Sequence, residues 1–311
     1  MRKYLVKILI FLLAVTVPLV CIFAYIQSLP RTFGQLLMGT TYHKYELLTE
    51  EESPKIILIG GSSSPYATDC AKISEAFGMP CINIGVTSYY GIDFYYNMLK
   101  DYMHEGDIVI LSPEAAMMRD GINYEVIWEG VENYPELLKK VPLRYWRKMF
   151  LSYYIYADKK FELLGKGYGT WEPEYKDDFG YYGDATEYRE TKLEYGYLRE
   201  DPITLDRSIV DRHFIAGANR LAKAAEAAGA RLFFYYPPVD VLAVTSDAEE
   251  VRGLDEYLRE KLDVEMINSI EDSLMEGRYF YDSNNHLTSE GQTLYTERLI
   301  DVLRDCITAE D

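Results

Sequence analysis

Histidine and cysteine are both scarce in this chain, with four of each among 311 residues. Neither a Cys-x-x-Cys pair nor a mixed cysteine and histidine spacing occurs, which excludes the usual zinc-binding patterns. Cys21 lies in an apolar run, and the other three, Cys70, Cys81 and Cys306, are odd in number. We therefore expect small buried thiols, with a Cys70–Cys81 disulfide as the alternative.

Basic residues are also few, with 32 lysines and arginines against 50 aspartates and glutamates. The resulting net charge of -18 repels phosphate groups and argues against a nucleic-acid partner. Hydrophobic residues make up 48% of the chain, which is enough for a sizeable core. The 29 tyrosines are densest between residues 124 and 197, where packing is a simpler explanation than sugar binding.

The N-terminus contains the longest run without charge. Arg2, Lys3 and Lys7 precede residues 8–26, which would form about 28 Å of helix, enough to cross a bilayer core. The residues that follow contain no clean small-x-small cleavage site. We predict an uncleaved signal anchor, with a cleaved signal peptide as the alternative. The basic residues place the N-terminus in the cytoplasm and the rest of the chain outside the cell membrane.

Four segments follow from this pattern. Residues 1–28 are the cytoplasmic tip and the anchor, and residues 29–52 are a linker. Residues 53–311 are predicted to form one extracytoplasmic domain. A tyrosine-rich insertion of irregular helices and loops interrupts this domain at about 114–202.

Short apolar runs alternate with amphipathic stretches in the rest of the domain. This alternation predicts an α/β fold, a parallel sheet with helices on both faces. In such sheets the functional residues gather at the carboxyl ends of the strands. The predicted strands are residues 56–59, 81–84, 107–112, 231–236 and 264–267, and the predicted helices are residues 67–77, 92–103, 212–228, 247–262 and 288–306.

A serine follows the first predicted strand. Ile56–Ile59 runs into Gly60 and Gly61, and the tight turn then presents Ser62. A serine hydroxyl needs a base, a group that orients the base, and donors for the oxyanion. Ser63 is the main rival nucleophile. An ordinary polar turn that caps the next helix would explain the same residues.

A carboxylate and an imidazole stand four residues apart near the other end of the domain. His286 is the candidate base, and Asp282 could hold its tautomer. The remaining histidines suit this role less well. His43 lies near the anchor, His104 precedes a strand at the opposite edge of the sheet, and His213 lies within a predicted helix. A hydrogen-bonded loop cap is the alternative explanation for Asp282 and His286.

These blocks resemble the SGNH (GDSL-like) hydrolase family. Ile59-Gly60-Gly61-Ser62 is similar to its strand and Gly-Asp-Ser block, Ile82-Asn83-Ile84-Gly85 to its second block, and Asp282 with His286 to its last block. The resemblance implies an SGNH-like (flavodoxin-like) sheet. It also implies that Ser62 is the nucleophile, that Asp282 and His286 complete a triad, and that the amides of Ser62 and Gly85 hold the oxyanion.

The chain departs from the family pattern at three points. Gly61 replaces the aspartate before the nucleophile, and the Asp282–His286 spacing is one residue longer than usual. The third block, Gly-x-Asn-Asp, is absent, and the corresponding strand runs into Leu111-Ser112-Pro113-Glu114. The resemblance covers residues 53–112 and 212–304.

Within the family, the chain is most similar to membrane-anchored members that accompany membrane-bound O-acyltransferases, such as DltD and AlgJ. This similarity implies a serine-dependent acyl-ester hydrolase or acyltransferase that acts on a cell-surface polysaccharide, typically in O-acetylation, or on a small acylated ester. The chemistry needs no cofactor. A plain surface carbohydrate esterase and a non-catalytic polymer-binding partner of a membrane-bound O-acyltransferase are the alternatives.

Overall fold

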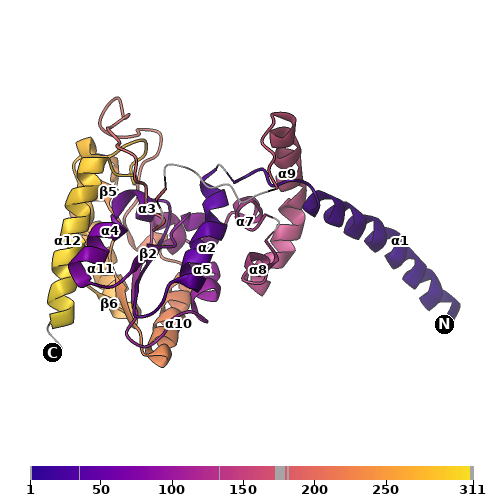
Figure 1. Cartoon of the computed structure of the whole chain (residues 1–311), viewed down its shortest axis with the longest axis horizontal. Helices are drawn as coiled ribbons and strands as arrows, with labels where there is room; N and C mark the ends of the chain where they lie inside the picture. The colour runs from indigo at the N-terminus through magenta and orange to yellow at the C-terminus, as the bar shows by residue number, and fades with distance from the viewer. Residues whose placement is uncertain (1, 35, 133, 172–178, 181, 309–311) are drawn as a thin grey trace.

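The computed structural model describes residues 2–34, 36–132, 134–171, 179–180 and 182–308. A long helix, α1 (Arg2–Gln27), projects from a layered α/β domain (Figure 1). Residues 3–22 of α1 are exposed along their whole length. Among the described residues, α1 alone is long and apolar enough to cross a membrane.

Five parallel strands form the central sheet, which confirms the predicted fold class. Their order is β2-β1-β3-β4-β6, and each neighbouring pair runs in the same direction. The strands are β1 (Ile56–Gly60), β2 (Cys81–Asn83), β3 (Ile108–Ser112), β4 (Arg231–Phe234) and β6 (Glu265–Met266). A separate parallel pair joins β5 (Val239–Asp240) to β7 (Leu274–Met275).

The strand sequences explain why both faces of the sheet are covered. Every residue of β1 is buried, as expected for a continuous apolar run. Because side chains alternate along a strand, Ile57 and Ile59 join one core, whereas Ile56 and Leu58 join the other. Helices therefore have apolar surface to cover on each side.

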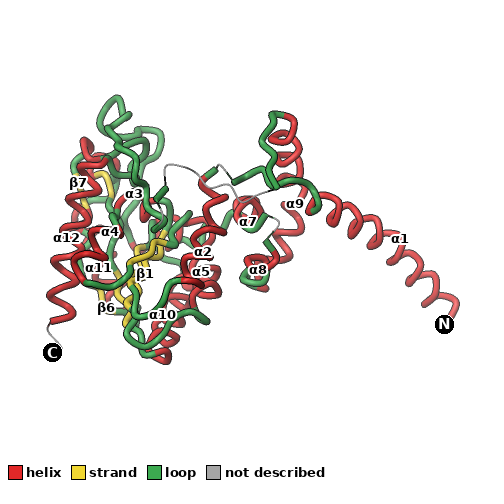
Figure 2. Tube along the Cα trace, in the orientation of Figure 1, coloured by secondary structure: helices red, strands yellow, loops and turns green. Residues whose placement is uncertain are grey.

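Two groups of helices cover these faces (Figure 2). Apolar residues of α5 (Gly91–Leu99), α10 (Arg212–Ala228) and α11 (Ala248–Lys261) belong to the first core, and those of α4 (Cys70–Phe77) and α12 (Ser289–Thr308) belong to the second. Local signals fix several ends. Gly229 ends α10 in the left-handed conformation, Asp247 starts α11 in a capping box, and the Thr288 hydroxyl accepts the Gly291 N–H.

The helix predicted over residues 67–77 is broken in the structure. A short helix, α3 (Ser63–Ala67), ends before Thr68, whose backbone is extended. Asp69 then caps α4 by accepting the Lys72 N–H. This break leaves α3 as a separate helical turn that begins directly after Ser62.

The segment at 114–202 contains more regular structure than expected. It holds α6 (Ala115–Met118), α7 (Tyr124–Gly130), α8 (Pro135–Leu138) and α9 (Trp146–Gly165), a helix of 20 residues. Residues 29–52, predicted as a linker, include α2 (Thr40–Glu50), and its Leu47 and Leu48 are buried in the first core. Short 3-10 turns occupy Leu37–Gly39, Ser88–Tyr90, Leu143–Tyr145, Arg207–Ile209, Val241–Ala243, Glu271–Ser273 and Gly277–Tyr279.

Candidate active site

The turn after β1 requires glycine at two positions. A Cβ on Gly60 would lie 2.5 Å from the Ser112 carbonyl oxygen on β3. A Cβ on Gly61 would lie 2.3 Å from the carboxyl carbon of Glu114. Because both positions lack a side chain, β1 can turn sharply and place Ser62 at the start of α3.

Ser62, His286 and Asp282 lie together in one hydrogen-bonded line. The Ser62 Oγ is 2.9 Å from His286 Nε2, and His286 Nδ1 is 2.8 Å from Asp282 Oδ1. With the proton on Nδ1, the imidazole donates to Asp282 and accepts the Ser62 hydroxyl proton. This is the arrangement that a serine nucleophile and its base require.

The rival nucleophile is not placed for attack. The Ser63 side chain is fully buried, and its Oγ has no hydrogen-bond partner among the described residues. The Ser64 hydroxyl donates to Asn83 Oδ1 instead of capping a helix. Of the three consecutive serines, only Ser62 meets the imidazole.

The loop that carries His286 is fixed at both ends. Phe280 and Leu287 form an antiparallel bridge, and the Ser283 hydroxyl accepts the His286 N–H at 3.1 Å. Asn284 is fully buried and makes three hydrogen bonds to backbone groups of Leu198 and Asp201. Asn284 therefore ties the loop to the 114–202 segment.

An aromatic ring supports the imidazole from its face. Tyr66 of α3 stacks on His286 with ring centroids 4.2 Å apart and planes 17° apart. The guanidinium of Arg189 lies over the Tyr66 ring, 5.4 Å from its centroid, and donates to the Leu287 carbonyl. Arg189 is buried although it is charged. This layer restricts the ring orientation that the Ser62 contact requires.

Asp282 is held in its ionised form. Burial acts to raise the pKa of Asp282, but the hydrogen bond and charge of His286, together with the charge of Lys192, bring it below the ordinary value. An ionised carboxylate stabilises the imidazolium that forms when His286 accepts a proton.

Glu114 occupies the space in front of Gly61. Its Oε1 accepts the Ser63 N–H at 2.6 Å, so a carboxylate from the end of β3 caps α3. The side chain is buried and lines the cavity next to Ser62. Glu114 also fills the space that a side chain at position 61 would need.

Gly85 does not direct its amide at this cavity. The Gly85 N–H donates to Asn83 Oδ1 at 3.0 Å, and the cavity wall after β2 consists of Thr87, Ser88 and Tyr89. The predicted oxyanion role of Gly85 would require this hydrogen bond to open, and it stays a prediction. The Ser62 N–H lies at the start of α3, where backbone amides favour a negative charge.

A cavity of about 270 Å³ opens beside the triad. Ser62, Ser283 and His286 line one side, and Glu114 and Arg119 line another. Residues 201–205, at the end of the 114–202 segment and just after it, line a further part of the wall. The cavity thus presents a hydroxyl, an imidazole, a carboxylate and a guanidinium to a small polar ligand.

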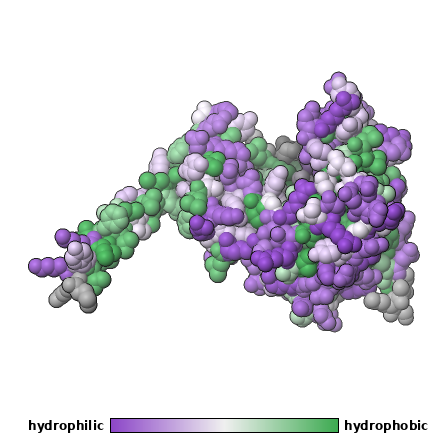
Figure 3. Space-filling view, turned by 180° about the vertical axis from the view of Figure 1, so that it is seen from behind, coloured by the Kyte–Doolittle hydropathy of each residue, from purple (hydrophilic) through white to green (hydrophobic). Residues whose placement is uncertain are grey.

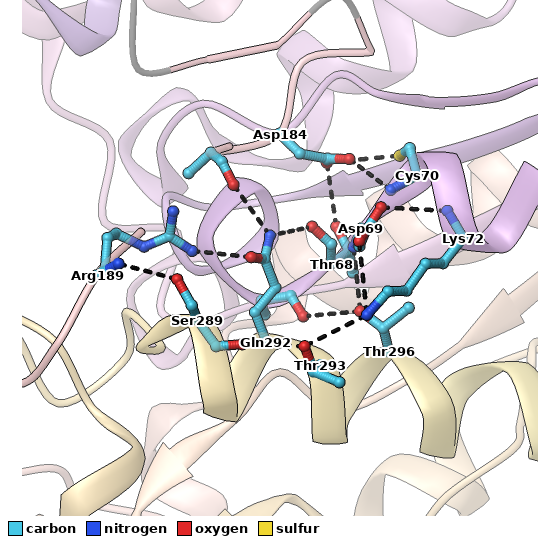
Figure 4. A network of polar contacts seen from close by, with 12 residues as sticks. Thr68, Asp69, Cys70, Lys72, Asp184, Arg189, Ser289, Gln292, Thr293 and Thr296 are labelled. Atoms are coloured by element: carbon cyan, nitrogen blue, oxygen red, sulfur yellow. Dashed lines mark hydrogen bonds and ion pairs between the residues drawn. The ribbon is translucent and has the colours of Figure 1, made fainter. Parts of the chain in front are cut away.

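Polar contacts behind the site join distant segments (Figure 4). Asp184 accepts the Cys70 N–H and the Asn83 side-chain amide, while Gln292 of α12 contacts Arg189 and the Thr68 carbonyl. Burial raises the pKa of Asp184 to about 6. The network fixes α3 and the residues around Arg189 against α12, and so supports Tyr66 and His286 indirectly.

Lys44 extends this support to α2. The buried ammonium donates to the carbonyls of Asn83, Gly85 and Gly183 at 3.1, 2.6 and 2.7 Å. Burial lowers the pKa of Lys44 to about 7, against the opposing attraction of Asp184. The helix that follows the apolar N-terminal segment therefore holds the end of β2 beside the site.

Four supporting residues were not found from the sequence: Lys44, Tyr66, Glu114 as a cap, and Arg189. Only Glu114 had a signal, since it follows a predicted strand, as Ser62 does. The others lie in helices and loops whose placement depends on tertiary packing. The site residues Ser62, Asp282 and His286 were all in motifs that the chain itself displays.

No family model and no curated protein matches this chain. Similar solved structures include one from Desulfitobacterium hafniense DCB-2, provisionally described as a lipolytic protein of the G-D-S-L family, and one from Streptococcus pneumonia, provisionally described as a platelet activating factor. Both have a TM-score of 0.39 and 12% identity. The first match covers 80% of this chain and 98% of the other, and the second 93% and 99%.

Proposed function

We propose that this protein is a serine-dependent acyl-ester hydrolase or acyltransferase whose nucleophile is Ser62. The observation that carries the proposal is the continuous line from Ser62 Oγ through His286 to Asp282, with contacts of 2.9 and 2.8 Å. If Asp282 and His286 only capped a loop, the imidazole would not need to contact a serine on another element. The fold supports the proposal, since Ser62 lies at the carboxyl end of a central strand.

The reaction would proceed in two balanced steps. Ser62 Oγ attacks the acyl carbon while its proton passes to His286 Nε2, and the same proton then leaves with the departing alcohol. A water or an acceptor hydroxyl next attacks the acyl-serine and gives its proton to His286. The bond between the acyl carbon and Ser62 Oγ then breaks, and His286 returns the proton to Oγ, which restores the Ser62 hydroxyl. Ionised Asp282 stabilises the imidazolium in both steps. The Ser62 N–H, with Gly85 if its amide turns, would hold the oxyanion.

The apolar N-terminal helix supports the substrate class that we propose. The apolar α1 would hold the domain at a membrane surface with the N-terminus in the cytoplasm, so acylated polymers outside the cell would be within its reach. We propose O-acetyl transfer to or from a polysaccharide, with an acylated small ester as the donor and a membrane-bound O-acyltransferase as a partner. Simple removal of acetyl groups uses the same residues and differs only in the acceptor.

Two observations favour a non-catalytic role. Glu114 stands in place of an amide donor, and the Gly85 N–H is engaged by Asn83. A protein that only binds polymer would retain the cavity without an activated serine.

A fluorophosphonate probe separates these functions because it reacts only with an activated serine. We expect the wild-type protein and Ser63→Ala to be labelled, and Ser62→Ala to remain unlabelled. The two variants are matched, since each removes one hydroxyl from the same turn. Labelling that survives Ser62→Ala would remove Ser62 as the nucleophile, and an unlabelled, folded wild-type protein would favour the non-catalytic role.

A further inference from the structure

The segment around α9 carries a charge opposite to that of the whole protein. Between residues 139 and 166 there are eight basic and two acidic residues, a formal charge of +6 in a chain of -18. The basic residues are Lys139, Lys140, Arg144, Arg147, Lys148, Lys159, Lys160 and Lys166, and the acidic ones are Asp158 and Glu162. A segment with this many basic residues in an acidic protein indicates a specific partner.

Large apolar side chains are exposed on the same helix. Phe150, Leu151 and Tyr154 are 62%, 64% and 71% exposed, and Phe161 is 45% exposed. Phe150, Tyr154 and Phe161 are spaced by four and seven residues, so they share one side of α9. We call Phe150, Leu151, Tyr154 and Phe161 the α9 face. Four large apolar groups on one exposed helix side indicate a contact surface.

Some of the nearby cations already have partners within the domain. Lys140 pairs with Asp101, Arg144 with Asp93 and Asp120, and Lys160 with Glu132. Arg147 and Lys148 at the first turn of α9 are exposed, and so is Lys166 just after its end, although Lys166 also pairs with Glu162 one turn earlier. These three cations therefore lie at the two ends of the helix that carries the α9 face.

The α9 face continues the surface of α1. Phe23 of α1 packs against Tyr153, with ring centroids 5.1 Å apart, and Gln27 donates to the Tyr153 hydroxyl. Tyr154, the next residue, belongs to the α9 face. Figure 1 shows α9 lying crosswise at the base of α1, and Figure 3 shows the apolar side chains of α1 leading up to the domain there.

A polar hollow lies at the far end of α9. It has a volume of about 280 Å³, and its only charged lining residues among those described are Arg31 and Lys166. Glycine and threonine residues supply most of the remaining wall. Arg31 is tied to Thr170 by two backbone hydrogen bonds, which keeps it beside α9. Two cations and exposed backbone suit a phosphate group.

We propose that the α9 face lies in the lipid–water interface of the membrane that α1 crosses. The apolar side chains would enter the boundary between headgroups and acyl chains, and Arg147, Lys148, Arg31 and Lys166 would contact anionic headgroups. Charge complementarity and continuity with α1 favour a lipid surface over a protein partner. The proposal rests on α1 spanning the membrane and not on the acyl chemistry.

The test uses the full chain in vesicles whose lipids carry a quencher near the headgroup. Cys21→Ala and Cys306→Ala remove the accessible thiols, while Cys70 and Cys81 are fully buried. A fluorophore is then attached at Phe150→Cys or, as a matched control, at Glu256→Cys on the exposed side of α11. We expect quenching at position 150 to exceed that at position 256 by roughly threefold or more in vesicles containing anionic lipid.

A charge variant and a second label decide the remaining outcomes. Arg147→Glu with Lys148→Glu should lower quenching at position 150, whereas Lys100→Glu with Lys223→Glu, exposed lysines elsewhere, should not. In a separate protein that carries Cys306→Ala alone, a label on native Cys21 reports the anchor. Quenching at Cys21 without quenching at position 150 would overturn the α9 proposal but not the anchor. A label at position 150 that is shielded from water but not quenched would assign the α9 face to a protein contact. No quenching at Cys21 would overturn both the anchor and the α9 proposal.

Discussion

His286 is contacted by a different kind of group on each of its functional sides. Asp282 meets Nδ1, Ser62 meets Nε2, and the Tyr66 ring covers the imidazole face. The imidazole therefore has one orientation in which it can accept a proton from serine. Because each contact comes from a separate segment, the side chain is positioned by the fold as a whole.

The triad makes a first prediction about turnover. His286→Ala should lower the turnover of a model acetyl ester by roughly a thousandfold or more, since the members of a triad act as a unit. Asp282→Asn should preserve the loop but lose much of the rate, because an amide does not stabilise the imidazolium. The measurement is per-molecule turnover of purified protein, with melting temperature as the control. If both variants melt earlier but keep wild-type turnover, the residues only cap a loop.

The lowered pKa of Asp282 makes a second prediction, about pH. His286 must be neutral to accept the serine proton, so kcat/KM should rise with pH in a single ionisation step. Asp282 remains ionised below its ordinary range, so it should add no second step above about pH 4. The stability that the ionised carboxylate contributes is present above its ordinary pKa and is lost as pH falls through the lowered value. A second acid step between pH 4 and 7 that disappears in Asp282→Asn would contradict this account.

At the scale of elements, the turn between β1 and α3 depends on residues that follow two strands. Gly60 ends β1 and is followed by Gly61 and Ser62. Glu114 follows β3, and its carboxylate caps α3. The Glu114 carboxylate therefore fills the space that a side chain at position 61 would need.

An exchange of these two side chains is the third prediction. Gly61→Asp alone should lower both turnover and melting temperature, because a Cβ there would lie 2.3 Å from the Glu114 carboxyl carbon. Glu114→Gly alone removes a helix cap and should cost about 1 kcal/mol of unfolding free energy. The double variant should recover more than the sum of the single effects predicts, since the new carboxylate enters vacated space. Additive losses in a double-mutant cycle would show that the two positions do not substitute for each other.

The elements were predicted well where local pattern decides them and poorly where packing does. Ile56–Ile59 and the Arg212–Ala228 helix are set by continuous or periodic apolar residues, and the structure has both. The predicted 67–77 helix breaks at Thr68 because Asp69 caps a new start. The 20-residue α9 was missed, since its many aromatic residues obscure the helical period. Ser62 and His286 were found by their motifs, but Tyr66 was not, because nothing in its local sequence indicates a stack.

At the scale of the whole molecule, the first two helices of the chain both contact the domain. Phe23 and Gln27 of α1 contact Tyr153, and Lys44 of α2 holds the carbonyls at the end of β2. A sequence-based division into anchor, linker and domain captures the order of these parts. It does not capture that α2 is part of the core, because a short helix with mixed composition has no distinctive pattern.

Topology is the fourth prediction. The basic residues precede the apolar run, so the domain should lie outside the cytoplasm. A reporter that is active only in the cytoplasm should stay silent when fused after Asp311, and one that is active only outside should give signal. The reverse pair of results would place the domain on the cytoplasmic side and remove cell-surface polymers as substrates.

The central claim is that Ser62 becomes acylated, and trapping the acyl-enzyme tests it most directly. Wild-type protein, mixed briefly with an activated acetyl ester and quenched in acid, should gain the mass of one acetyl group. Peptide mapping should place that group on Ser62, and the adduct should be absent from Ser62→Ala but present in Ser63→Ala. An ester that is consumed without any acetyl group on Ser62, or with the group on another residue, would contradict the account.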